Sequence, residues 1–376
     1  MAPCGVESMT AADVTILGAG IAGLACAAAC ALRGRSVEVL EQAPALREVG
    51  AGLQVAPNGG RVLRALGVEV EGPESQAVHL LDGPSGRSVI RMPLGPGFRL
   101  VHRADLVAAL AARAAALGVR LRLGAAVEAV EAGALRLRVG ERVAVGRLVG
   151  ADGARGAARA FVAPGHVARF TGQVAWRALV PVGPGWAPEA QVYMGPGRHL
   201  VIYPLREGRL LNIVGVEERA AWAAPGWSVE DDPEAFRRAF GGFAAPARDL
   251  LARVETAHLW GLMDHGMVAR WSRGGCTLIG DAAHPTLPFL AQGANLALED
   301  AWTLATALDD PEGWEAERRP RVARALAAAA GNARNYHLGG LRRVAARAGL
   351  RVLGRMAPGL PLRGYRWLYG FDATAG

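Results

Sequence analysis

Hydrophobic residues near the N-terminus predict a strand, a helix and a second strand. Residues 14–17 (VTIL) form a short apolar run, as in a strand that is buried on both faces. A helix composed almost entirely of Ala, Leu and Cys follows, and residues 36–40 (SVEVL) predict the next strand. Residues 13–52 therefore read as the first βαβ-like unit of a parallel sheet and the loop after it.

Alternating segments further along the chain predict a second, antiparallel sheet. From Val174 to Val216, four such segments are separated by Gly and Pro turns, which is typical of a sheet with its own core. Asn58 is a candidate cap for a helix that ends near Leu66. Further strands are expected at 79–81, 88–92, 119–123, 126–131, 135–139, 142–145, 148–149 and 276–279. Further helices are expected from 101 to about 117, at 234–251, at 293–308 and over the C-terminal part.

Composition limits the class of protein. A chain of 376 residues can form one large or two moderate domains, and its 42 basic residues are all Arg, which against 34 acids gives a net charge of +8. The Arg residues are scattered and lack interleaved aromatic residues, so nucleic acid is not a predicted partner. The charge is interpreted as a surface property that also attracts anionic substrates.

Cysteine usage and hydropathy predict a cytoplasmic protein that holds no metal. The four cysteines, Cys4, Cys26, Cys30 and Cys276, form no CxxC motif or Cys/His cluster, so buried free thiols in a reducing compartment are expected. No signal-peptide pattern and no apolar run of about 18 residues is present, so stable membrane insertion is not predicted.

Three separated glycine-containing segments predict one long nucleotide cofactor. In the first, Gly18 makes a tight turn after the strand, Gly20 lets the backbone approach a pyrophosphate, and Gly23 allows close packing of helix and strand. Glu41 ends the second strand, where an acid normally binds a ribose hydroxyl. The other two segments are GADG at 150–153 and GDAAHPTLPFLAQGANLALEDA at 280–301. No second GxGxxG follows, so a separate nicotinamide-binding domain is not predicted.

Together with EVGAGLQVAPNG, VHRADL and VAWRALVP, these segments resemble the group A flavoprotein aromatic hydroxylases, the p-hydroxybenzoate hydroxylase superfamily. The flanking residues resemble its branch of salicylate, 3-hydroxybenzoate and 6-hydroxynicotinate hydroxylases. The resemblance covers 13–370 and implies an α/β fold: a Rossmann-like FAD-binding domain with an inserted antiparallel-sheet substrate domain and C-terminal helices. The implied boundaries are 10–80, 98–172 and 268–330 for the FAD-binding domain, 81–97 and 173–267 for the substrate domain, and 331–376 for the C-terminal helical segment.

The resemblance also implies which residues hold FAD. Gly18, Gly20, Gly23 and Glu41 match the positions that bind the ADP half. Arg103 matches an arginine at the pyrophosphate, Asp281 an acid at the ribityl and pyrophosphate part, and Asp152 an acid used for both FAD and NAD(P)H. The helix start beneath the flavin pyrimidine ring matches Gly293, Ala294 and Asn295. The sequence departs from the pattern at Gly156, where the family usually has a serine.

The pocket residues implied by the resemblance are Tyr203, Gln292 and Pro288, the last beside the oxygen-reactive edge of the flavin. The alternative reading of Tyr203 is a core strand tyrosine, and Pro288 is equally well a turn proline on local grounds. Gln54 falls where one relative has a catalytic histidine, and a neutral amide cannot act as a general base. His284 is interpreted as a structural histidine.

The implied activity is an external monooxygenation. NADH or NADPH binds transiently and reduces FAD, O2 gives a flavin hydroperoxide, and a small aromatic or heteroaromatic substrate is hydroxylated by a monomer or homodimer. A flavin halogenase would need a catalytic lysine, and the chain has none. Two alternatives stay open: a membrane-associated hydroxylase of quinone biosynthesis, with the basic segment 341–358 on anionic lipid, and a non-enzymatic nucleotide-binding protein. In the first reading that segment competes with a simpler role, covering the FAD domain.

Overall fold

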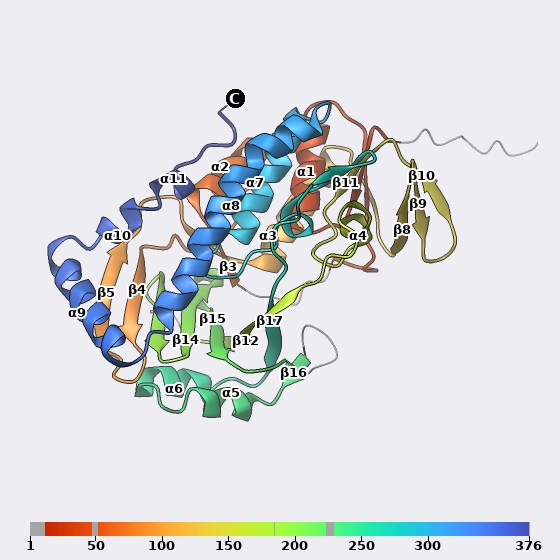
Figure 1. Cartoon of the computed structure of the whole chain (residues 1–376). Helices are drawn as coiled ribbons and strands as arrows, with labels where there is room; N and C mark the ends of the chain where they lie inside the picture. The colour runs from red at the N-terminus through yellow and green to blue at the C-terminus, as the bar shows by residue number, and fades with distance from the viewer. Residues whose placement is uncertain (1–11, 47–51, 184, 223–228, 376) are drawn as a thin grey trace, which may run out of the picture.

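The computed structural model describes residues 12–46, 52–183, 185–222 and 229–375. Cys4 and the first four residues of the EVGAGLQVAPNG segment therefore lie outside the described residues. None of the described helices is long and apolar enough to cross a membrane. Within the described ranges the chain forms two large sheets, and a long C-terminal helix runs across both of them (Figure 1).

A six-stranded sheet forms the half of the molecule that carries the first glycine motif. Its strand order is β18-β19-β11-β1-β2-β7, and β1 pairs in parallel with both β2 and β11. The strands are β1 (Val14–Leu17), β2 (Val37–Leu40), β7 (Arg120–Arg122), β11 (Arg147–Gly150), β18 (Ser272–Arg273) and β19 (Cys276–Leu278). Helix α1 (Ile21–Ala31) packs against both α3 (Arg103–Ala116) and α7 (Gly293–Thr306). The predicted βαβ unit is confirmed.

An eight-stranded sheet forms the other half, with strand order β16-β17-β12-β15-β14-β13-β4-β5. Its strands are β4 (Ala77–Asp82), β5 (Ser88–Pro93), β12 (Arg169–Pro181), β13 (Glu189–Gly195), β14 (Arg198–Leu205), β15 (Leu210–Glu218), β16 (Val229–Asp231) and β17 (Ala257–Asp264). The sheet is antiparallel except that β13 pairs in parallel with β4, which comes from an earlier part of the chain. The predicted antiparallel pairing over 174–216 is confirmed, and the parallel partner β4 comes from outside that range.

Two short helices cover one face of the eight-stranded sheet, where one helix was expected. They are α5 (Pro233–Ala239) and α6 (Ala245–Leu251), which lie beneath the sheet in Figure 1. The chain leaves the helix between them at Gly241 and Gly242, residues that are costly in a helix interior. Phe236 stacks on Trp176 of β12 with ring centroids 5.2 Å apart, which anchors α5 to the sheet.

The connection between the two sheets also differs from the prediction in two places. Helix α2 (Pro57–Leu66) begins after Ala56, so Asn58 is not its cap but a buried residue of its first turn. The VHRADL segment starts as strand β6 (Arg99–His102), which pairs with β3 (Gly52–Val55), and becomes helical only at Arg103. This pairing brings the two sheets' connecting segments together beside the site described below.

Smaller elements complete the fold. A three-stranded sheet of β8 (Val127–Glu131), β9 (Ala134–Leu137) and β10 (Arg142–Ala144) projects at one end, and α4 (Ala157–Val162) follows β11. Helix α8 (Pro311–Tyr336) crosses both halves, and α9 (Gly340–Met356), α10 (Leu360–Arg363) and α11 (Arg366–Tyr369) follow it (Figure 1).

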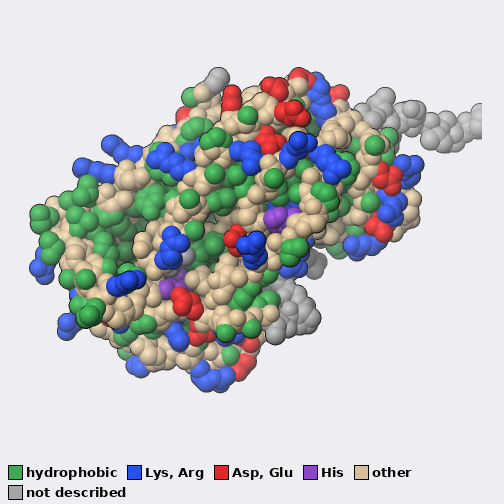
Figure 2. Space-filling model, in the orientation of Figure 1, with side chains coloured by type: hydrophobic (Ala, Val, Ile, Leu, Met, Phe, Trp, Pro, Cys, Tyr) green, Lys and Arg blue, Asp and Glu red, His purple; other side chains and the backbone are tan. Residues whose placement is uncertain are grey.

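Helix α9 packs on β5, so the expectation that this segment covers the FAD-binding half is wrong for α9. Arg343 and Arg347 of α9 both pair with Asp82 at the end of β4, which ties the helix to the eight-stranded sheet. Its other face leaves Leu341, 88% exposed, and Met356, 79% exposed, at the surface. On the face shown in Figure 2, arginines are distributed rather than gathered into one patch.

Candidate active site

A cavity of about 330 Å³ lies where the two sheets meet. It is bounded by the N-terminal turn of α1, the loop after β11, the GD segment and the start of α7 on one side, and by β12, β14 and β15 on the other. The predicted site residues that line it are Gly20, Arg103, Tyr203, Asp281, Pro288, Gln292, Gly293 and Ala294. The remaining ones, Gly18, Gly23, Glu41, Asp152 and Asn295, are not among the residues that line it.

The three glycines of the first motif have different surroundings. A Cβ on Gly23 would lie 1.9 Å from the carbonyl oxygen of Gly18, and Gly18 itself has a φ of +98°, so both positions require glycine. A Cβ on Gly20 would meet no protein atom within 4 Å, because this residue borders the cavity. Helix α1 has no side-chain cap, so its first N–H groups remain available to an anion.

Glu41 organises the same loop. Its carboxylate accepts hydrogen bonds from the backbone N–H of Ala19 and of Ala43, each at 2.8 Å. The acid thereby holds the glycine turn against the end of β2. The open face at Gly20, the uncapped helix end and this carboxylate fit the pyrophosphate and ribose of a dinucleotide such as FAD.

Asp281 faces the cavity on the turn that follows β19. Its carboxylate is accessible through the cavity but is otherwise enclosed by protein, and this enclosure raises its pKa, against the opposing charges of His284, Arg103 and Arg159. Arg159 donates to the carbonyl oxygen of Ala282 at 2.7 Å and so fixes the turn. A carboxylate in this position suits the hydroxyl groups of a ribityl chain, which can donate hydrogen bonds to it.

A buried network holds that turn to α7. His284 is 2.5 Å from Asp300, which also accepts from the Gly280 N–H and from Arg318. Glu299 pairs with Arg318 and Arg321. The Glu299 and Asp300 side chains are both fully buried. His284 thus faces Asp300 and not the cavity, in agreement with its interpretation as structural. Burial of a charged network of this kind demands that every partner be present.

The start of α7 presents unpaired donors to the cavity. The helix has no side-chain cap, and Gly293 and Ala294 line the cavity. The Oε1 atom of Gln292 accepts from Asn58, whereas its buried Nε2 has no hydrogen-bond partner among the described residues. The N-terminus of this 14-residue helix, with an amide donor beside it, favours a negatively charged group in the adjoining cavity.

The side chains of two predicted cofactor residues form hydrogen bonds with the protein backbone. Asn295 donates to the carbonyl oxygens of Gln54 and Ala291 and accepts from the Ala56 N–H, which clamps α7 to β3. Asp152 accepts from the Ala158 N–H at the start of α4, at 2.9 Å, and burial raises its pKa to about 6.

The departure from the family pattern at Gly156 has a structural reason. A Cβ at this position would lie 1.9 Å from the carboxyl carbon of Asp152. Glycine therefore makes room for the Asp152 side chain to fold back onto α4. One carboxylate oxygen of the GADG acid thus accepts from the start of α4, and its other oxygen, Oδ1, has no hydrogen-bond partner among the described residues.

The substrate end of the cavity contains a buried tyrosine and an arginine. Tyr203 of β14 is 6% exposed and packs on Gly52, and its burial raises its pKa well above the ordinary value. Arg177 of β12 borders the same cavity, and enclosure by protein lowers its pKa. Its guanidinium stacks on Trp260 at 4.6 Å, and its Nε has no hydrogen-bond partner among the described residues. Pro288 also lines this end.

Among the ionisable residues that line the cavity, Arg177 and His199 were not predicted from the sequence. Both lie in segments whose alternating pattern predicts strands, VAWRALVP and HLVIYPLR. His199 stands four residues before Tyr203 on β14, and side chains at even spacing share one face of a strand. The period-two pattern therefore contained a signal for His199. The sequence contained no corresponding signal for Arg177. Its place beside the cavity depends on the pairing of β12 with β15 and β17, which are distant in the chain.

Comparisons with known proteins agree with this geometry. The FAD binding domain family matches residues 11–319. The chain is 35% identical to 3-amino-4-hydroxybenzoate 2-monooxygenase of Streptomyces cremeus over 86% of this chain and 88% of that protein. It is 35% identical to 3-hydroxybenzoate 6-hydroxylase of Polaromonas naphthalenivorans, over 96% of each. The fold matches HpxO of Klebsiella pneumoniae complexed with FAD and uric acid, with a TM-score of 0.81, 24% identity, and 95% and 96% of the two chains covered.

The chain belongs to the FAD binding domain family, in its branch of flavin-dependent aromatic monooxygenases. The expected fold class, the family and the FAD cofactor are confirmed. The three glycine-containing segments follow β1, β11 and β19 of the six-stranded sheet, and the cavity lies between these segments and the eight-stranded sheet.

Proposed function

We propose that this monooxygenase hydroxylates a small phenolic carboxylate, and that Arg177 is the counter-charge for the carboxylate group. The observation that carries the proposal is the Arg177 guanidinium, enclosed at the cavity wall with an Nε that has no hydrogen-bond partner among the described residues. Enclosure of a cation costs free energy unless an anion or several acceptors accompany it. Two relatives whose names specify hydroxybenzoates support the same substrate class.

Two further polar side chains of the cavity, Tyr203 and His199, suit a phenolic hydroxyl group. Tyr203 keeps its proton, because burial raises its pKa, and it is a hydrogen-bond donor to a phenolate oxygen. His199 has a pKa well below its ordinary value because of burial and the neighbouring His337, so it is a neutral acceptor near pH 7. A phenol that transfers its proton to His199 gains electron density on the ring, which favours electrophilic hydroxylation.

The cofactor part of the proposal follows from the motifs. Bound FAD supplies the oxidising chemistry, with O2 as the oxidant and NADH or NADPH as a reductant that binds only transiently. Gly20, Asp281 and the start of α7 would hold the flavin, and the donors at Gln292 and Gly293 would favour negative charge on its reduced ring. The apolar residues Val201, Val214 and Phe289 exclude water from the reacting edge.

We further propose that the six-stranded sheet is the centre of the FAD-binding part and the eight-stranded sheet the centre of the substrate part.

Matched pairs of ligands test the carboxylate assignment. Purified holoenzyme is titrated with 3-hydroxybenzoate and with phenol, and with 3-amino-4-hydroxybenzoate and 2-aminophenol, following the flavin spectrum and product formation per NAD(P)H consumed. The wild type should prefer the carboxylates. Arg177→Met should reduce that preference by about 10- to 100-fold, the range for a hydrogen bond to a charged group, and should change the affinity for phenol little.

A matched control separates this effect from a general loss of positive charge. Arg169→Met changes an exposed arginine at the other end of the same strand and should behave as the wild type. The proposal is wrong if Arg177→Met retains full flavin content and the same discrimination between 3-hydroxybenzoate and phenol.

A further inference from the structure

His199 is the inner end of a chain of hydrogen bonds that leads from the cavity to the surface. Its Nδ1 is 2.7 Å from Nε2 of His337, the residue that directly follows α8. Nδ1 of His337 is in turn 2.8 Å from Oε1 of Glu218, at the end of β15. His199 is 2% exposed and His337 8%, whereas the Glu218 side chain is 55% exposed. Three consecutive groups thus connect the buried cavity wall to solvent.

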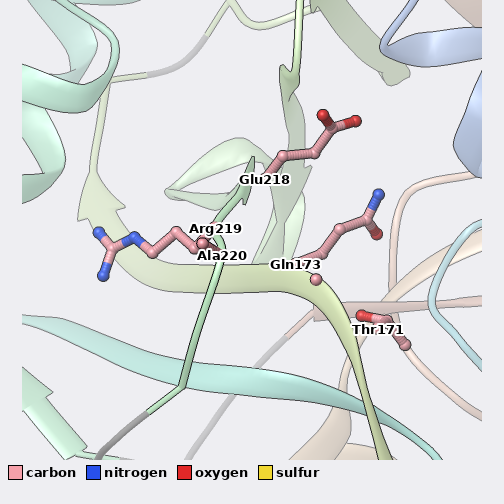
Figure 3. A pocket seen from close by; sticks show the side chains of 6 residues that line it. Thr171, Gln173, Glu218, Arg219 and Ala220 are labelled. Atoms are coloured by element: carbon pink, nitrogen blue, oxygen red, sulfur yellow. The ribbon is translucent and has the colours of Figure 1, made fainter.

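The outer end of this chain opens into a surface hollow. Figure 3 shows the hollow, in which the Glu218 and Gln173 side chains extend in the same direction and Arg219 extends the opposite way. Thr171, Gly172 and Ala220 complete its lining. The Gln173 amide is 3.4 Å from Nδ1 of His337, so it flanks the contact to Glu218. Glu218 can therefore exchange protons with bulk water directly.

We propose that His199, His337 and Glu218 form a proton path that carries the phenolic proton of the substrate to the surface. The proposal rests on the proposed function, because it requires a substrate with a titrating hydroxyl group. His337 and Glu218 do not touch the substrate and act on it through His199.

The hydrogen-bond pattern fixes the direction of the path. Two groups compete for Nδ1 of His337: the Glu218 carboxylate, which can only accept, at 2.8 Å, and the Gln173 amide, which can only donate, at 3.4 Å. The shorter contact is to Glu218, so His337 donates from Nδ1. Its Nε2 is then the acceptor for the Nδ1–H of His199. Nε2 of His199 is then the unprotonated ring nitrogen available to a molecule in the cavity. Burial lowers the pKa of both histidines, although Glu218 raises that of His337, so both rings are neutral near pH 7.

The transfer balances without any other reactant. The phenolic O–H bond breaks and a new N–H forms at Nε2 of His199, while its Nδ1–H proton passes to Nε2 of His337. The Nδ1–H proton of His337 passes to the Glu218 carboxylate, which releases it to water. The substrate becomes a phenolate and each ring has exchanged its tautomer. Movement of a proton in the reverse direction reprotonates the product and restores both tautomers.

The groups that surround the path are consistent with this role. Tyr336 of α8 lies 5.2 Å from the His199 ring and Phe289 lies 5.9 Å from it, so both exclude water from the inner ring. Burial raises the pKa of Tyr336 to about 12, so this neighbour does not titrate near neutrality. Arg198 is the nearby cation that lowers the pKa of His337.

Rapid mixing with a pH indicator tests the path in the holoenzyme. The enzyme is mixed with 3-hydroxybenzoate in weak buffer containing phenol red, and proton release and the phenolate spectrum are followed together. Glu218→Gln removes only the outer acceptor at an exposed position and should slow proton release by about 10-fold or more, within the range of acid–base assistance. Added imidazole should restore the rate in this variant in proportion to its concentration and should leave the wild type unchanged.

Controls separate the path from a structural role for the same residues. Glu230→Gln alters an exposed acid of the same sheet and should release protons at the wild-type rate. An unchanged release rate in Glu218→Gln, or a slower one that imidazole does not restore, overturns the proposal. If the wild type fails to bind 3-hydroxybenzoate at all, the proposed function is at fault instead.

A measurement without substrate then decides the path. Nitrogen-15 NMR of histidine-labelled holoenzyme should find His199 and His337 both neutral and protonated at Nδ1, with the His337 signal shifted in Glu218→Gln. Protonation of His337 at Nε2 would overturn the proposal independently of the substrate.

Discussion

Asp300 of α7 accepts a hydrogen bond from the backbone N–H of Gly280 at 3.0 Å, although 20 residues separate them. The same carboxylate pairs with Arg318 of α8 at 2.7 Å. One buried acid therefore connects the turn that carries Asp281 to two helices. The position of a predicted cofactor residue depends on a network that lies behind the cavity.

Asp300→Asn should destabilise the protein markedly. The substitution keeps the shape but leaves Arg318 buried without its full counter-charge, which typically costs about 3–5 kcal/mol. The pKa of Asp300 lies below its ordinary value because His284 and Arg318 outweigh burial. Its contribution is therefore present above the unfolded-state pKa of about 3.9 and is lost as the pH falls further.

Urea unfolding of flavin-saturated protein at pH 7 and at acidic pH measures this difference. Glu312→Gln, at an exposed position of α8, is the matched control and should unfold as the wild type. A loss of less than about 1 kcal/mol at pH 7 would mean that the network contributes little.

Asp152→Asn should have the opposite effect on stability. Burial raises the pKa of Asp152 to about 6, so the folded protein favours the protonated acid. The contribution of Asp152 to the free energy of unfolding is therefore fully present below the unfolded-state pKa of about 3.9. It is lost as the pH rises through the folded-state pKa of about 6. Asparagine keeps an acceptor for the Ala158 N–H without a charge.

The variant should therefore be more stable than the wild type at pH 8, by up to about 3 kcal/mol, and equal to it near pH 4. Thermal unfolding of both proteins across this pH range is the measurement. A constant difference at all pH values would show that ionisation of Asp152 is not its cause.

Asp281→Ala should lose flavin. The carboxylate borders the cavity, and its removal takes away an acceptor for hydroxyl groups of the cofactor, which should weaken FAD binding by about 10-fold or more. Flavin content after gel filtration and a titration of apoprotein with FAD measure the effect. Asp249→Ala changes an exposed acid on α6 and serves as the control. Full affinity in Asp281→Ala would remove this acid from the cofactor site.

Tyr203→Phe should uncouple the reaction without unfolding the protein. Only a hydroxyl group is lost, and the ring still packs on Gly52. If the hydroxyl orients a phenolate, hydroxylation should fall about 100-fold, while NAD(P)H oxidation falls less and H2O2 increases. Product formed per NAD(P)H consumed, with peroxide measured alongside, provides the answer. Unchanged coupling would place Tyr203 among the core tyrosines.

Local sequence patterns predicted most helices and strands. A regular hydrophobic repeat is visible within one segment, so these elements can be recognised without knowing which distant residues they contact. The βαβ unit at 13–52 is an example, since Gly18 and Gly23 are required by packing within the same turn. Asn58 was assigned wrongly as a cap, because its residue type is common at helix starts. Its side chain instead bonds Glu299 from a distant helix, a contact that no local pattern contains.

The sequence by itself determined the family, the cofactor and the two-sheet organisation, because glycine turns and alternating strands are local and chemically specific. Only the tertiary structure decided which polar groups face the cavity. Arg177 borders the cavity because three strands far apart in the chain pair around it. His199 is connected to the surface, through His337, because α8 ends beside β14. Such juxtapositions arise from the packing of distant segments, and this packing has no signature in the order of neighbouring residues.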